Sequence, residues 1–158
     1  MIYPVTRLLA IEEIKQLKAR YFRHMDMREW DQMAQVFCKD VRFDCSEGFD
    51  STGLDGTWRG EVGPITEGRD KLMAWISGSF ATTTSAHHGH AHEIWLDSET
   101  EAHGIVAMED WILDADRRTL LINAAGHYHE QYRIEDGQWR IKEVKLTRLF
   151  VSRIERTI

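Results

Sequence analysis

Residues 119–151 read TLLINAAGHYHEQYRIEDGQWRIKEVKLTRLFV, and this stretch decides the class of fold. It predicts two long strands, over 119–134 and 138–151, joined by Glu135-Asp136-Gly137. Asp-Gly is a strong hairpin signal because both residues tolerate the positive φ values of a tight turn. Two further strands are expected upstream, over 88–97 and 102–114, again with short polar connections. Short connections between successive strands predict an antiparallel meander.

The first half of the chain predicts helices. Apolar residues recur at spacings of three to five over 8–27, which gives one apolar stripe on a helix. A short helix is expected over 29–37, an alternating strand over 41–45 and a third helix over 69–80. Helices followed by a meander predict a single α+β domain over residues 1–158. Its helices should pack on one face of a curved, mostly antiparallel sheet that encloses a pocket.

Residues 46–66 are the long stretch without periodicity. They contain five glycines and Pro64, a density of helix and strand breakers that no regular element tolerates. A loop of this length in a compact domain is either disordered or functional, for instance as a lid over a pocket.

The composition narrows the class of protein. The 158 residues are 42% hydrophobic and 29% charged, which is typical of one globular domain. The net charge is −6 and basic residues form no block, so we expect no nucleic-acid partner. No apolar run reaches the ~18–20 residues of a membrane span, and the N-terminus lacks an export signal. Cys38 and Cys45 form no disulfide framework, which favours a cytoplasmic location.

Four of the eight histidines lie close together, in His87-His88-Gly89-His90-Ala91-His92. Strand alternation would place His88, His90 and His92 on one face and His87 on the other. A His-x-His pair can bind one metal ion, but no HExxH, CxxC or repeated carboxylate spacing completes a ligand set. The pattern therefore favours exposed histidines with one pointing into a pocket, and no metal.

Two acids occupy positions where a charge is unfavourable. Asp26 lies near the end of an apolar helix, where the helix dipole disfavours a carboxylate, so it is either solvated or held inward by a partner such as histidine. Tyr21 precedes it by five residues, about 140° round an ideal helix, so the helix must end or bend for both to enter one pocket. Strand alternation in Glu109-Asp110 turns Asp110 inward, where a carboxylate needs a partner. A functional role and a structural hydrogen bond are equally compatible with that position.

Four stretches carry a resemblance to a known family: IEEIKQLKARYF over 11–22 with Asp26 and Trp30-Asp31, HHGH over 87–90, MED over 108–110 and DGQWRIKE over 136–143. Together they resemble the SnoaL-like group of the nuclear-transport-factor-two-like superfamily, over about 11–150. The chain is most similar to bile-acid 7α-dehydratase, and more distantly similar to scytalone dehydratase and hexachlorocyclohexane dehydrochlorinase. The resemblance implies a cone-shaped α+β domain.

The resemblance also implies site residues. Matched by local motif, the family's functional positions correspond to Tyr21, Asp26, His87 and Asp110. A further active-site tyrosine of the family is aligned with Cys45 here, and the 46–66 loop differs in length and composition. Both differences bear on the choice of substrate.

The hypothesis is a cofactor-independent lyase, or an isomerase, acting on a small hydrophobic, cyclic or steroid-like substrate. His87 would be the base, since a neutral imidazole accepts a proton near pH 7. Asp26 would hold its tautomer, Tyr21 would donate a hydrogen bond to a leaving or carbonyl oxygen, and Asp110 would orient the pocket or its water. Five side chains are expected to form the apolar walls: Trp30, Phe43, Trp75, Met108 and Trp111.

Two other functions remain open. One is a noncatalytic ligand-binding or assembly module, and the other is a metal enzyme that uses His88, His90 and either His127 or His129. A homodimer or homotrimer through the sheet is also expected, because the final strand closes on Leu149-Phe150-Val151, which is apolar on both faces. The alternative is that the residues after 151 fold back over this face.

Overall fold

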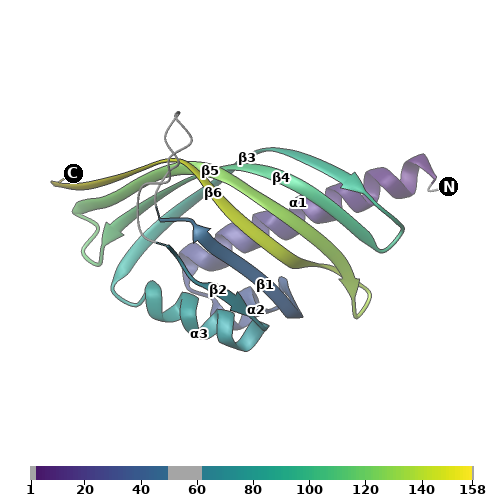
Figure 1. The fold of residues 1–158 in the computed structure, drawn as a ribbon, viewed down its shortest axis with the longest axis horizontal. Helices are drawn as coiled ribbons and strands as arrows, with labels where there is room; N and C mark the ends of the chain where they lie inside the picture. The colour runs from purple at the N-terminus through teal and green to yellow at the C-terminus, as the bar shows by residue number, and fades with distance from the viewer. Residues whose placement is uncertain (1–2, 50–61, 158) are drawn as a thin grey trace.

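The computed structural model describes residues 3–49 and 62–157. Three helices and six strands follow the chain in α+β order, which confirms the predicted class (Figure 1). No described helix is both long and apolar enough to cross a membrane. The helices are α1 (Pro4–Met27), α2 (Trp30–Ala34) and α3 (Arg69–Ser79). The strands are β1 (Phe37–Glu47), β2 (Ile65–Glu67), β3 (Thr83–Leu96), β4 (Glu101–Asp114), β5 (Thr119–Glu135) and β6 (Gln138–Thr157).

The six strands form one sheet in the order β2-β1-β6-β5-β4-β3. Strands β3 to β6 are the predicted antiparallel meander. The last of them meets β1, which runs parallel to β6, and β2 pairs antiparallel on the other side of β1. The sheet is therefore mostly antiparallel, with one parallel pairing, between β1 and β6.

The helices cover one face of the curved sheet (Figure 1). The apolar stripe of α1 is buried against that face through Ile14, Leu17, Tyr21 and Met25. Helix α3 packs on the same face. Its Leu72 and Ile76 are buried, and Trp75 and Phe80 pack against the core. Burying the stripe removes apolar surface from water, which stabilises the fold by about 25 cal/mol per Å² of buried apolar area.

Several boundaries differ from the sequence-based expectation. Helix α1 begins at Pro4 rather than at 8, because proline is favoured in the first turn of a helix. Helix α2 ends at Ala34 rather than 37, and Phe37 instead begins β1, fully buried. Strand β3 begins five residues earlier than expected, at Thr83.

Two loop predictions are also corrected. The stretch 46–66 was expected to be irregular throughout, but β1 continues to Glu47, and Ile65–Glu67 form β2. Residues 50–61 lie outside the described residues, so a lid there stays a prediction. The residues after 151 do not fold back, because β6 stays paired with β5 as far as Thr157.

Candidate active site

Asp26 and His87 form the hydrogen bond that the sequence predicted. Helix α1 ends immediately after Asp26, with the left-handed residue Arg28 (φ 56°) as its C-cap. Asp26 Oδ1 lies 2.7 Å from His87 Nδ1, and its Oδ2 accepts the His87 backbone N–H at 2.9 Å. Ser85, two residues earlier on β3, donates its hydroxyl to Oδ1 at 2.8 Å. The carboxylate is thus held in place by three donors from β3.

The orientation of His87 follows from this pair. A carboxylate only accepts hydrogen bonds, so Nδ1 carries the proton and the neutral ring presents an unprotonated Nε2. The ring is buried, with Phe22 and Phe80 at centroid distances of 6.4 and 5.8 Å. Nε2 points away from Asp26 and lies 4.0 Å from Asp110 Oδ2, too far for a hydrogen bond. His87 therefore has the geometry of an oriented base.

Asp110 is buried on the inner face, as strand alternation predicted, and its partner is an arginine. Arg148 Nη2 on β6 lies 2.8 Å from Asp110 Oδ2, while Arg148 Nε donates to the Gly48 carbonyl at 3.0 Å. Asp110 Oδ1, by contrast, has no hydrogen-bond partner among the described residues. A buried carboxylate oxygen without a donor is costly, so the Arg148 contact at Oδ2 is the interaction that offsets the burial of this charge.

Sequence reasoning missed Arg148. The signal was available, because Val144, Leu146 and Arg148 alternate along one strand and the first two are buried. A buried arginine in an apolar row needs a charged or hydrogen-bonding partner, just as a buried aspartate does.

Two tyrosines lie beside these charged groups. Tyr21 on α1 and Tyr128 on β5 are both buried, and their ring centroids lie 5.7 Å apart, edge to face. Burial raises the pKa of both phenols, so each is a neutral hydroxyl at physiological pH. Tyr128 was not predicted as a site residue, although it alternates with half-buried His127 and exposed His129 and so had to face inward.

The site groups open onto one cavity of about 270 Å³. Tyr21, His87, Asp110 and the two unpredicted residues Tyr128 and Arg148 lie on its wall. Asp26 stands behind His87 and does not line it. The rest of the wall is largely apolar and includes Met25, Phe43, Cys45, Trp75, Ile76, Phe80, Ile112 and Leu146.

Of the five residues expected to form the apolar walls, Phe43 and Trp75 line the cavity and the other three do not. Trp30, the first residue of α2, packs against the core and does not line the cavity. Met108 shares the inward face but lies behind the wall, with its Sδ 3.1 Å from Arg148 Nη1. Trp111 follows Asp110 on a strand, so it points to the outer face, where it is exposed.

Cys45 is the cavity residue at the position of the family's additional tyrosine. Burial raises the pKa of its thiol to about 12, so the thiolate is scarce near neutral pH. Cys45 therefore shapes the cavity and is not suited to act as a nucleophile.

Comparison with known proteins agrees with this architecture. A model of the SnoaL-like domain matches residues 6–145. This chain belongs to the SnoaL-like family. The predicted resemblance is thus confirmed at the level of the family, while the closer likeness to bile-acid 7α-dehydratase stays a prediction.

Several solved structures share the SnoaL-like fold of this chain. A candidate scytalone dehydratase from Novosphingobium aromaticivorans has a TM-score of 0.78 and 21% identity, over 98% of this chain and 93% of that one. A type 2 hexachlorocyclohexane dehydrochlorinase, LinA, has a TM-score of 0.76 and 14% identity, over 96% and 93%. A candidate aromatic ring hydroxylase from N. aromaticivorans has a TM-score of 0.72 and 18% identity, over 97% and 96%. At these identities the likeness establishes the fold.

The histidine cluster of this SnoaL-like domain differs from the prediction. A β-bulge between Gly89 and His92 shifts the alternation by one residue. His88 and His90 are exposed, whereas His92 is half-buried and its Nε2 is enclosed without a partner among the described residues. The three histidines therefore do not share a face. The metal-enzyme alternative used His88 and His90 with His127 or His129, and these do not form a group of neighbouring ligand atoms in the described part of the chain.

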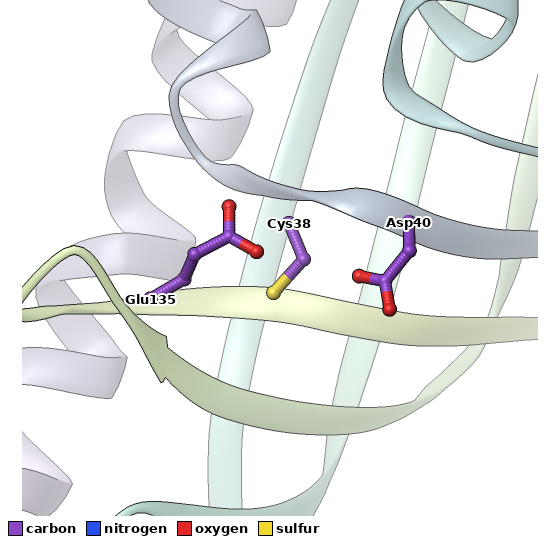
Figure 2. A group of neighbouring side chains, drawn as sticks. All are labelled: Cys38, Asp40 and Glu135. Atoms are coloured by element: carbon purple, nitrogen blue, oxygen red, sulfur yellow. The ribbon is translucent and has the colours of Figure 1, made fainter.

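One group of side chains in the SnoaL-like domain, from β1 and β5, brings potential metal-ligand atoms together. Figure 2 shows Cys38, Asp40 and Glu135 pointing toward one another; their ligand atoms lie within 4.8 Å, the one such group in 3–49 and 62–157. Arg133 already neutralises it, with Nη2 2.6 Å from Asp40 Oδ1 and 3.1 Å from Glu135 Oε2. Burial raises the pKa of the Cys38 thiol, which disfavours the thiolate that a metal would require. The group is better described as an ion-pair network than as a metal site.

Proposed function

We propose that this protein is a cofactor-independent lyase of the dehydratase type, acting on a small, cyclic, hydroxylated substrate. The observation that carries the proposal is the geometry of His87, whose Nδ1 is hydrogen-bonded to Asp26 so that Nε2 is free beside the cavity. Relatives of the same fold are named as a dehydratase and a dehydrochlorinase, and both names describe eliminations. The largely apolar wall fits a hydrophobic substrate.

The elimination would proceed with the chain's own groups. His87 Nε2 accepts the proton from the carbon next to the leaving group, and the C–H electron pair forms the C=C bond. The C–O bond breaks with its electrons going to oxygen, and the imidazolium returns the proton to that oxygen. Water leaves and His87 is again neutral. Asp26 stabilises the transient imidazolium, and neutral Tyr21 donates a hydrogen bond to the departing oxygen.

The Asp110–Arg148 pair would select a hydroxylated substrate. Before the reaction, the leaving hydroxyl would donate its hydrogen to the carboxylate of Asp110, which lines the cavity. Arg148 is paired with Oδ2 of that carboxylate and offsets its charge. A halide could not make this hydrogen bond, so the pair favours loss of water over loss of halide.

The proposed reaction is tested with one- and two-ring β-hydroxy ketones, whose dehydration gives conjugated enones. Proton NMR would follow the appearance of the vinyl proton in the presence of EDTA. The proposal expects turnover that EDTA leaves unchanged and that the His87→Gln variant lacks. Turnover that persists in His87→Gln, or that EDTA abolishes, would contradict it.

Substitution of Asp110 is expected to weaken the binding of hydroxylated ligands selectively. Fluorescence titration with 2-naphthol and naphthalene measures the contribution of the hydroxyl. Asp110→Asn should weaken 2-naphthol binding by about tenfold or more, because a hydrogen bond to a charged acceptor contributes about 1.5–3 kcal/mol, and should leave naphthalene binding unchanged. Glu109→Gln, one residue away on the outer face, is the matched control. An equal loss for both ligands would show that Asp110 only supports the fold.

Self-association through the outer face of the sheet forms part of the proposal, together with a cytoplasmic location. Trp111, Leu149 and Phe150 are 42%, 65% and 44% exposed, and the helices lie on the opposite face. Light scattering at micromolar concentration should give a dimer or trimer of the 18.5 kDa chain. A mass near that of the single chain would refute the association.

A further inference from the structure

Lys18, in the second half of α1, is a fully buried charged residue. It lies one turn before Tyr21 on α1, and its side chain is 0% exposed. Its Nζ lies 2.6 Å from Glu130 Oε1 on β5. The other carboxylate oxygen, Oε2, accepts the hydroxyl of Tyr132 at 2.6 Å. The charge of Lys18 is therefore matched by a carboxylate whose two oxygens are both engaged.

The ammonium group of Lys18 also contacts the two tyrosines of the cavity. Its Nζ lies 3.8 Å from the ring centroid of Tyr21 and 3.6 Å from that of Tyr128. These are cation–π distances, and such a contact is strongest where water is excluded. Lys18 does not line the cavity itself. It thus lies behind the site, between the faces of two rings whose hydroxyls belong to the site.

Stability alone does not account for this pair. Removing two charges from water costs several kcal/mol per ion, and well-packed apolar residues of similar volume are often as stable as a buried ion pair or more so. Lys18 contacts Glu130, the rings of Tyr21 and Tyr128 and, with Nζ 5.0 Å from its centroid, the ring of Phe22. The pair instead constrains where those rings lie.

We propose that Lys18 and Glu130 are positioning residues, which hold the Tyr21 and Tyr128 rings so that both hydroxyls remain beside His87 and Asp110. This role rests on the proposed function, because the tyrosines matter only if the cavity is a reaction site.

The test replaces the whole pair, because removing one partner leaves an uncompensated buried charge. The variant Lys18→Met with Glu130→Leu keeps the volume apolar and foldable. Lys15→Met, on the exposed side of the same helix, is the control. The first measurement is the ¹³C NMR spectrum of tyrosine-labelled protein. The chain has only four tyrosines, and exposed Tyr3 serves as an internal reference.

The proposal predicts that the Tyr21 and Tyr128 signals shift and broaden in the double variant, while Tyr3 is unchanged. With a β-hydroxy ketone that is turned over, kcat should fall roughly 10–100-fold with little change in KM, because misplacement by about 1 Å has that effect. Lys18→Arg should restore part of kcat, since it keeps the cation. Unchanged Tyr21 and Tyr128 signals, or an unchanged kcat, would overturn the positioning role. The NMR result needs no turnover, so it separates failure of this inference from failure of the proposed function.

Discussion

Replacing His87 with glutamine is expected to lower kcat of the proposed elimination by about 10³–10⁴-fold, the contribution that a positioned acid–base group makes. Gln keeps the approximate size of the side chain but has no nitrogen that accepts a proton near pH 7. Asp26→Asn should have an effect of similar order, because an amide can donate to Nδ1 and so favour the tautomer that protonates Nε2. Steady-state kinetics on the β-hydroxy ketone substrate measures both effects.

The matched control for this experiment is His88→Gln, the neighbouring residue on the same strand. His88 is exposed and faces away from the cavity, so its replacement should leave kcat close to the value of the unmodified protein. Equal losses of kcat in His87→Gln and His88→Gln would show that kcat depends on the integrity of the strand and not on His87 as a base. A His87→Gln variant with normal kcat would remove His87 from the mechanism.

The largest effect on stability is expected from Gly126→Ala. A Cβ at Gly126 would lie 2.0 Å from the Thr147 carbonyl oxygen and 3.0 Å from the Arg148 Cα. Both atoms belong to the backbone of β6, so no side-chain rotation relieves the clash. We expect the free energy of unfolding to fall by about 2–4 kcal/mol in urea titrations. Binding of 2-naphthol should weaken as well, because the displaced strand carries Arg148.

Gly78→Ala is the control for the glycine experiment. Gly78 lies within α3, and a Cβ there would meet no atom within 4 Å. Alanine is the better helix former by about 1 kcal/mol, so the variant should be as stable as the parent or slightly more stable. A Gly126→Ala protein as stable as Gly78→Ala would mean that β5 and β6 can separate at Gly126, where their register shifts, without loss of stability.

The sequence predicted most of the fold because its periodicities are local. The apolar stripe of α1 and the Asp-Gly turn between β5 and β6 each depend on residues near one another in the chain. The bulge after Gly89 could not be predicted in this way. It depends on how β3 meets β4, and it reverses the face of His92. The parallel pairing of β1 with β6 is likewise a property of the closed sheet.

The site was predictable in part for the same reason. The inward position of Asp110 follows from strand alternation alone, and the Asp26–His87 contact followed from the family resemblance. Trp111 was assigned to the cavity by its residue type, although the alternation that turned Asp110 inward already turned Trp111 outward. Lys18 could not be assigned at all, because its burial depends on Glu130, which lies 112 residues further along the chain.

The most direct test of the central claim is the tautomer of His87 in the substrate-free protein. Long-range ¹H–¹⁵N NMR of histidine-labelled protein distinguishes a protonated Nδ1 from a protonated Nε2, and His87→Gln assigns the signal. The Asp26–His87 hydrogen bond predicts that neutral His87 carries its proton on Nδ1, leaving Nε2 unprotonated beside the cavity, and that Asp26→Asn shifts this preference. A neutral His87 protonated on Nε2 in the unmodified protein would contradict its assignment as the base.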